Sequence, residues 1–292
     1  MIMKKHMKIL FPTDFSEPAS HAFRYALVLA GVIKANIQLI HAIFPETAAM
    51  DVPVVSANAT QVRIEASDEA MKAFKELGLA QVATLGINLP DVVAATEIGA
   101  PVRTIIQAAK RDDVDLIIVG TRGERKGVDK MLGSVAAGVV QRATCAVMVV
   151  AEKVPLEGPA NIAYATDLMD SDPLEIWRMI QLLKPFNPHV HCIHFTMADE
   201  MKESAGKVEQ MKAFFEDHSS AISIEFHELP GKKLAEDLNH FVDDKDIDLL
   251  VMYQPKRNTM QRLFHRSKVK KMALNSHVPL LVQKEGQLIS FQ

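Results

Sequence analysis

The stretch GTRGERKGVDKMLGS, Gly120 to Ser134, decides the fold because it joins a strand to a helix. The apolar run Asp115 to Val119 stops abruptly at this glycine, as a buried strand does. Residues 135–142 behind the stretch have the apolar spacing of a helix. In an open parallel sheet, ligands lie beyond the carboxyl ends of the strands. The stretch therefore stands where such a sheet would bind a ligand.

The glycines of this stretch favour a phosphate chain as the ligand. Gly120 and Gly123 allow a tight turn and a close approach of the backbone. Gly133 and Ser134 come at a helix N-terminus, where free N–H groups and the helix dipole attract an anion. The alternative is a loop that is merely rich in glycine, but loops of this length are uncommon and usually functional. The two best-known phosphate loops, GxxxxGK[ST] and GxGxxG, do not occur here.

Strands and helices alternate on both sides of the stretch. Strands are expected at 8–13, 36–43, 91–97, 115–119 and 146–150, with helices between them. Ser16 is the expected N-cap of the first helix. Residues 44–60 have no clear period and are expected to form a loop, and Gly78 is expected to end the helix that follows. Such alternation implies a parallel sheet with helices on both faces.

The pattern repeats after a linker at 151–159. Asn161 begins a copy of the strand that begins at Lys8, 153 positions earlier. Further strands are expected at 189–195, 221–227, 248–253 and 278–282, and helices at 171–185, 199–217, 231–243 and about 267–275. We therefore predict two tandem α/β domains, 1–152 and 153–292, each an open parallel five-stranded sheet of strand order 3-2-1-4-5.

The spacing G-x2-G-x9-G-S is similar to the nucleotide loop of the universal stress protein family, and the chain resembles that family along nearly its whole length. The resemblance implies a Rossmann-like fold of the adenine nucleotide alpha hydrolase type. It also implies that the first domain binds ATP, with or without magnesium. The positions that it assigns to the nucleotide are Pro12, Thr13, Asp14, Ala42, Ile43, Val119, Gly120, Arg122, Gly123, Gly133, Ser134 and Val135.

Topology gives a separate argument for Asp14. The strands that end at Asp14 and Gly120 are neighbours in the order 3-2-1-4-5, so both residues open onto one crevice. A carboxylate in that crevice accepts hydrogen bonds from ribose hydroxyls. The alternative is that Asp14 caps the helix beginning near Ser16.

The second domain is not expected to bind ATP in the same way. Asp167 matches Asp14, but Tyr253, Lys256 and Arg266 stand at the three glycine positions. Their side chains would block a close approach of the backbone to phosphates. The basic cluster at 256–271 either binds another anion or an acidic partner, or forms a solvated face.

Composition excludes several classes of function. A net charge of −3 provides no basic field for nucleic acid or an anionic membrane, and an aromatic content of 6% does not favour base stacking. No apolar run is long enough to span a bilayer, and the first residues lack a signal core. Cys145 and Cys192 are expected to be buried thiols in the cytoplasm. His191, Cys192 and His194 alternate between the faces of one strand, so no metal site is expected.

The resemblance implies a stress-response protein in which bound ATP regulates an interface with an unidentified protein partner. A slow ATPase or phosphotransferase is one alternative, although no catalytic base is evident, and an interaction module with a vestigial pocket is another. Single-domain members of the family pair through their last strands. An intramolecular pseudo-dimer through strands 146–150 and 278–282 is therefore expected, with a homodimer as a further form of association.

Overall fold

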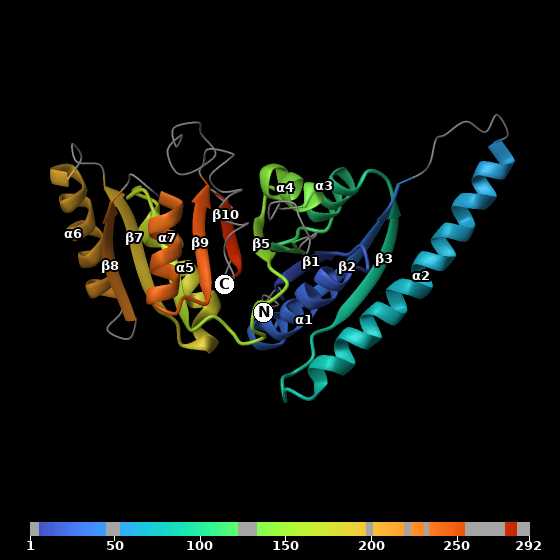
Figure 1. The fold of residues 1–292 in the computed structure, drawn as a ribbon, viewed down its shortest axis with the longest axis horizontal. Coiled ribbons are helices and arrows are strands. Elements are labelled where there is room, and N and C mark those ends of the chain that lie inside the picture. Colours follow the sequence, from blue (N-terminus) through green and yellow to red (C-terminus); the bar gives the residue numbers. More distant parts are fainter. Residues whose placement is uncertain are drawn as a thin grey trace, which may run out of the picture. The chain divides into compact units, whose positions relative to one another are not determined.

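The computed structural model describes residues 6–44, 53–121, 133–196, 201–218, 223–230, 234–254 and 278–284 of the chain. The chain divides into two compact units, Met1–Leu156 (unit 1) and Glu157–Gln292 (unit 2), both visible in Figure 1. Each unit contains an open, parallel, five-stranded sheet flanked by helices, which confirms the fold class expected from the sequence. None of the helices in the described ranges combines the length and the apolar character that crossing a membrane requires.

Unit 1 has the sheet order β3-β2-β1-β4-β5, which is the predicted order 3-2-1-4-5. The strands are β1 (Lys8–Pro12), β2 (Asn36–Ile43), β3 (Val92–Ile98), β4 (Leu116–Gly120) and β5 (Ala146–Val150). The helices are α1 (Glu17–Ile33), α2 (Pro53–Ala83), α3 (Pro101–Arg111) and α4 (Ser134–Arg142). Helix α1 packs with α2, and α3 packs with α4. Because the crossovers are right-handed and run in opposite directions, these two pairs cover opposite faces of the sheet.

Helix α1 fixes the core of unit 1. Its N-cap is Ser16, whose Oγ accepts a hydrogen bond from Ala19 N at 3.3 Å, as the sequence predicted. On its buried face, the ring of Phe23 lies 5.2 Å from that of Phe11 on β1. The same ring stacks on Phe74 of α2 with centroids 5.1 Å apart. Phe23 therefore ties α1 to both the sheet and the neighbouring helix.

Helix α2 differs from the prediction at both ends. It begins at Pro53, inside the stretch expected to be a loop, and it runs through Gly78 to Ala83. A Cβ at Gly78 would lie 2.6 Å from two ring carbons of Phe23. Gly78 is therefore a notch that receives an aromatic ring, and the prediction that it ends the helix is wrong because tertiary packing overrides the local signal.

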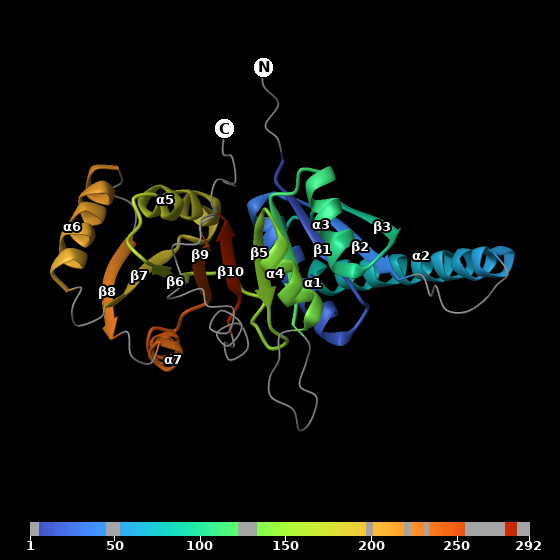
Figure 2. The ribbon, with the colours of Figure 1, turned by 90° about the horizontal axis from the view of Figure 1, so that it is seen from above.

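Unit 2 has the sheet order β10-β9-β6-β7-β8, which repeats the order of unit 1. The strands are β6 (Asn161–Thr166), β7 (His189–Thr196), β8 (Ser223–Pro230), β9 (Leu249–Gln254) and β10 (Leu280–Lys284). The helices are α5 (Asp172–Leu183), the 3-10 turn η1 (Lys184–Phe186), α6 (Met201–His218) and α7 (Leu234–Asp244). Figure 2 shows α5 and α7 on opposite sides of these strands. The helix expected near 267–275 falls outside the described residues.

Tyr164 on β6 carries a poorly accommodated hydroxyl group. The side chain is completely buried, and its hydroxyl has no hydrogen-bond partner in the part of the chain that the structure describes. Phe11 occupies the matching position of β1, 153 residues earlier. Because a buried unpaired polar group costs about 1–3 kcal/mol, we expect Tyr164→Phe to raise the free energy of unfolding by about 1 kcal/mol. Urea unfolding followed by circular dichroism measures this change.

The reverse substitution Phe11→Tyr is the matched control, because it buries a hydroxyl at the equivalent place in unit 1. It should lower the free energy of unfolding by a similar amount. A loss of stability in Tyr164→Phe would contradict the prediction and would mean that the hydroxyl has a favourable partner.

Candidate functional site

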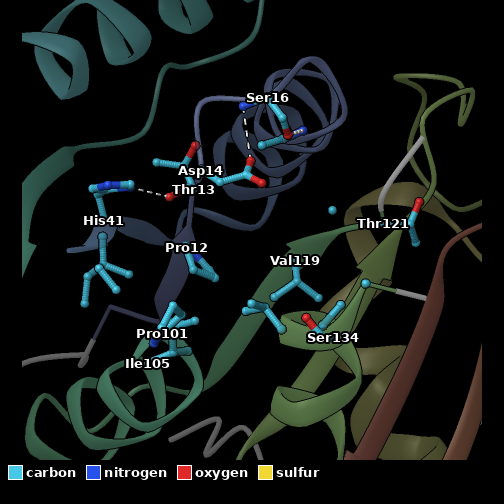
Figure 3. A pocket seen from close by; sticks show the side chains of 17 residues that line it. Pro12, Thr13, Asp14, Ser16, His41, Pro101, Ile105, Val119, Thr121 and Ser134 are labelled. Carbon is cyan, nitrogen blue, oxygen red and sulfur yellow. Dashed lines mark hydrogen bonds between the residues drawn. The ribbon is translucent and has the colours of Figure 1, made fainter. Parts of the chain in front are cut away.

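A pocket lies at the carboxyl ends of the strands of unit 1 (Figure 3). It is lined by Pro12, Thr13, Asp14, Ser16, Ala19, Ile40, His41, Ala42, Pro101, Ile105, Val119, Gly120, Thr121, Gly133, Ser134, Val135 and Ala136. The cavity volume is about 160 Å³. Sites that enclose a whole small ligand measure about 300–1,000 Å³, so this cavity has room for only a portion of a nucleotide-sized ligand.

Most of the residues assigned from the sequence come together in this pocket. Those that line it are Pro12, Thr13, Asp14, Ala42, Val119, Gly120, Gly133, Ser134 and Val135. Ile43 does not line it, and its side chain is buried in the core, where it is 5% exposed. Arg122 and Gly123 fall outside the described residues.

Helix α3 adds residues that the sequence analysis did not place in the site. Pro101 and Ile105 lie in and after its first turn, and both line the pocket. A signal was available, because Pro101 follows β3 at the same edge of the sheet and opens a helix. Ser16, His41 and Thr121 also line the pocket and were not assigned to it.

The turn after β1 holds Asp14 at the pocket. Thr13 Oγ1 accepts a hydrogen bond from Phe15 N at 2.9 Å, and Asp14 Oδ1 accepts one from Ser16 N at 3.1 Å. Phe15 has a left-handed φ of 62°. The ring of His41 stacks on Phe15, with Nδ1 2.8 Å from the carbonyl oxygen of Thr13. Ser16, and not Asp14, caps α1, so the carboxylate of Asp14 stays exposed at the pocket. Its second oxygen, Oδ2, forms no hydrogen bond with a described residue.

The first turn of α4 brings free backbone N–H groups to the pocket. Its N-cap is Gly133, which provides no side-chain hydrogen bond, so the N–H groups of Ser134 and Val135 have no intrahelical acceptor. Figure 3 shows Ser134, Val119 and Asp14 around the pocket, each from a different element. The described lining residues include no Lys or Arg. Among the described residues of this pocket, the feature that suits an anion is therefore the helix terminus.

Gly120 has a structural role that the sequence analysis did not anticipate. A Cβ at this position would lie 3.1 Å from the carbonyl oxygen of Pro18 and 3.3 Å from Ala22 Cβ. The absence of a side chain therefore lets the first turns of α1 pack against the end of β4. Gly120 also lines the pocket, so helix packing and ligand approach both favour glycine here.

The turn after β6 in unit 2 repeats the turn after β1. Thr166 Oγ1 accepts a hydrogen bond from Leu168 N at 2.8 Å, and Leu168 has a left-handed φ of 56°. His194 Nδ1 lies 3.1 Å from the carbonyl oxygen of Thr166, as His41 does beside Thr13. The Thr166 hydroxyl donates to the buried carboxylate of Asp172, and burial raises the pKa of that carboxyl.

The described part of unit 2 differs from unit 1 at the position that matches Gly120. Tyr253 stands at the position equivalent to Gly120 and is 4% exposed. A pocket of about 210 Å³ lies toward the carboxyl ends of β6, β7 and β8, lined by Thr166, Leu168, Cys192, His194, Val208, Lys212, Phe226, His227 and Glu228. Residues Val208 and Lys212 place it beside α6. Lys256, Arg266 and the basic cluster at 256–271 lie outside the described residues.

Comparisons with known proteins agree with the fold. A profile of the Universal stress protein family matches residues 5–151, half of the chain. A universal stress protein of Methanocaldococcus jannaschii is 26% identical over 51% of this chain and 96% of its own length. A Coxiella burnetii homologue of universal stress protein A is 31% identical over 49% of this chain and 94% of its own length.

Solved structures show the same fold over nearly the whole chain. The crystal structure of a universal stress protein from Archaeoglobus fulgidus covers 96% of this chain and 98% of that chain, with 20% identity and a TM-score of 0.71. A universal stress protein solved in complex with cAMP covers 50% of this chain and 98% of that chain, with 22% identity and a TM-score of 0.37. From the match of the family profile over half of its length, this chain belongs to the universal stress protein family.

Proposed function

We propose that unit 1 binds ATP and that nucleotide occupancy regulates a cytoplasmic stress response through a protein partner. The observation that carries this proposal is the pocket itself. It combines an exposed carboxylate, Asp14, with an uncapped helix N-terminus at Ser134. The carboxylate suits ribose hydroxyls, and the helix terminus suits phosphate. Pro12, Val119 and Ile105 provide the apolar surface that an adenine base needs.

The ligand is proposed to lie across the sheet edge between β1 and β4. The switch point of a sheet ordered 3-2-1-4-5 falls between these two strands. The ribose would lie near Asp14 and the phosphates near Gly133 and Ser134. Magnesium, where it is bound, would accompany the phosphates near Ser134. Asp14, the carboxylate among the described lining residues, is assigned to the ribose. Unit 2 is proposed not to bind ATP, because Tyr253 replaces Gly120.

Two further expectations are part of the same proposal. A cytoplasmic location agrees with Cys145 and Cys192, which are buried and form no disulfide in the described part of the chain. An intramolecular pseudo-dimer, formed by pairing of residues 146–150 with residues 278–282, stays a prediction.

Titration calorimetry with ATP tests the proposal on protein shown to be free of carried-over nucleotide. We expect one ATP per chain, measured with magnesium and again with EDTA. Asp14→Ala should weaken binding about tenfold or more, because a hydrogen bond to a charged group contributes about 1.5–3 kcal/mol. Asp167→Ala removes the matching carboxylate of unit 2 and should leave ATP affinity unchanged.

The same samples distinguish the alternatives. ADP and cAMP, titrated in parallel, show how much affinity depends on the phosphate chain. Phosphate release that is lost in Asp14→Ala would favour the slow ATPase. Absence of ATP binding by the wild-type chain would refute the proposal and favour an interaction module with a vestigial pocket.

A further inference from the structure

Three histidines and a glutamate come together on two neighbouring strands of unit 2. His189 and His191 lie on β7, and Glu225 and His227 lie on β8, with His191 directly opposite Glu225. One ligand atom each from His189, His191 and Glu225 lies within 4.8 Å of the other two. In the sequence, His191 stands beside Cys192 and His194 along one strand. Its neighbours Glu225 and His227 follow only from the register between β7 and β8.

This cluster is separate from the edge of the sheet discussed above. His189 is the first residue of β7 and Ser223 the first of β8, so the cluster stands at the amino ends of the strands. It faces α7, where the rings of His191 and His227 lie 5.8 and 4.9 Å from that of Phe241. The Glu225 side chain is 52% exposed and that of His189 is 29% exposed, so an ion in solution can reach the cluster.

We propose that His189, His191, Glu225 and His227 bind one divalent transition-metal ion of the zinc class. Zinc binds imidazole nitrogen and carboxylate oxygen at about 2.0–2.2 Å, usually with tetrahedral geometry, which separates neighbouring ligand atoms by about 3.3–3.6 Å. Glu225 Oε1 lies 3.5 Å from His189 Nε2, and Glu225 Oε2 lies 3.6 Å from His191 Nδ1 and 3.4 Å from His227 Nε2. The three separations are close to the edges of such a tetrahedron, but the first runs to Oε1 and the other two run to Oε2. The carboxylate must therefore turn to present one oxygen to the ion.

His227 needs the largest adjustment. Its Nε2 lies 3.0 Å from His191 Nδ1, a hydrogen-bond distance, so the two rings must separate by a few tenths of an ångström when both bind the ion. His189, His191 and Glu225 form the core of the site, because one ligand atom from each lies within 4.8 Å of the other two.

The surroundings prepare the histidines for metal binding. The Nδ1 of His189 hydrogen-bonds to Ser223 Oγ, which directs Nε2 toward Glu225, and such outer partners are usual for metal-bound histidines. Burial, together with the neighbouring His189 and His227, lowers the pKa of His191 to about 4. Burial also lowers the pKa of His227. Neutral imidazole is the form that binds metal, so these rings are available near pH 7.

The cluster is not a consequence of the fold. The positions of unit 1 that match His189, His191, Glu225 and His227 hold Asn36, Gln38, Val93 and Ala95. In unit 1, the Gln38 amide instead donates to Asp112 Oδ2 at 2.8 Å. The same sheet therefore forms in unit 1 without these four side chains, so folding alone does not explain their presence in unit 2.

Calorimetric titration with Zn²⁺ tests the proposal on full-length protein that carries no affinity tag, is free of nucleotide and has been treated with chelator. We expect one Zn²⁺ per chain and a rise in the melting midpoint on binding. Co²⁺ should give the visible absorption of a four-coordinate ion. Mg²⁺ should not bind to this cluster, because it prefers oxygen ligands in an octahedral arrangement.

Variants assign the site. Glu225→Gln and His189→Ala should each weaken Zn²⁺ binding about 100-fold, whereas His240→Ala, at an exposed histidine on α7, should leave the affinity unchanged. Circular dichroism of each variant without metal shows whether it is folded. If His189→Ala is unstable, Glu225→Gln alone tests the site, because Glu225 is exposed and its substitution should not affect folding. The proposal is overturned if wild-type protein binds no Zn²⁺, or if binding survives both substitutions.

Discussion

Replacing Phe23 by alanine should lower the free energy of unfolding of unit 1 by about 3–5 kcal/mol, the usual cost of removing a buried aromatic ring. Phe23 is 1% exposed. Its ring contacts Phe11 on β1 and Phe74 on α2, so the substitution removes contacts with the sheet and with a second helix at once. Urea unfolding followed by circular dichroism measures the loss.

Phe44→Ala is the matched control, because Phe44 is 58% exposed and the same ring is removed. Its effect should stay within about 0.5 kcal/mol. Gly78→Ala provides a second test of the notch. Alone it should destabilise the protein through the contact with Phe23, whereas in the Phe23→Ala background the clash is absent and alanine should add about 1 kcal/mol of helix stability. Simple addition of the two effects would argue against the notch.

Gly99→Ala should lower the free energy of unfolding by about 2–3 kcal/mol, because two unfavourable effects act together. Gly99 has a φ of 152°, and an added Cβ would lie 2.5 Å from the hydroxyl oxygen of Thr104. Its N–H donates to the carbonyl oxygen of Ile43 at 2.9 Å, which fixes the turn between β3 and α3. Since Pro101 follows in this turn and lines the pocket, ATP affinity should fall as well.

Gly86→Ala separates backbone strain from crowding. Gly86 also has a positive φ, 69°, but a Cβ there would have no atom within 4 Å. It should cost about 1–2 kcal/mol, the usual penalty for a left-handed residue with a side chain. Nucleotide affinity should not change, because Gly86 does not line the pocket. Equal losses of stability and affinity in the two variants would contradict the role assigned to Gly99. Thermal unfolding and ATP titration measure both quantities.

Local patterns in the sequence predicted most of the fold. β2 and β5 have the predicted bounds, and Ser16 is the N-cap of α1 as expected. These signals are local because they depend on apolar periodicity and on one cap residue. Gly78 was misjudged because a glycine that ends a helix and a glycine that receives a ring from another helix look alike in sequence.

The candidate site was predictable where it follows the carboxyl ends of the strands. Asp14 and Gly120 end neighbouring strands, so topology alone brings them to one pocket. Of the two residues placed at the end of β2, Ala42 lines the pocket and Ile43 is buried in the core. His189 and Glu225 were not connected, because 36 residues separate them and their contact depends on the register of β7 and β8.

The repeated turn makes each half of this polypeptide an internal standard for the other. Thr13 and Thr166 hold the equivalent left-handed residues, Phe15 and Leu168, in place, and the first of these turns borders the pocket with Asp14. Features shared by both copies thus report what folding demands. Features found in one copy, such as the glycines at 120 and 123 or His189 and His191 on β7, report what a particular task demands. A swap of matching segments between the halves would separate these two demands within a single molecule.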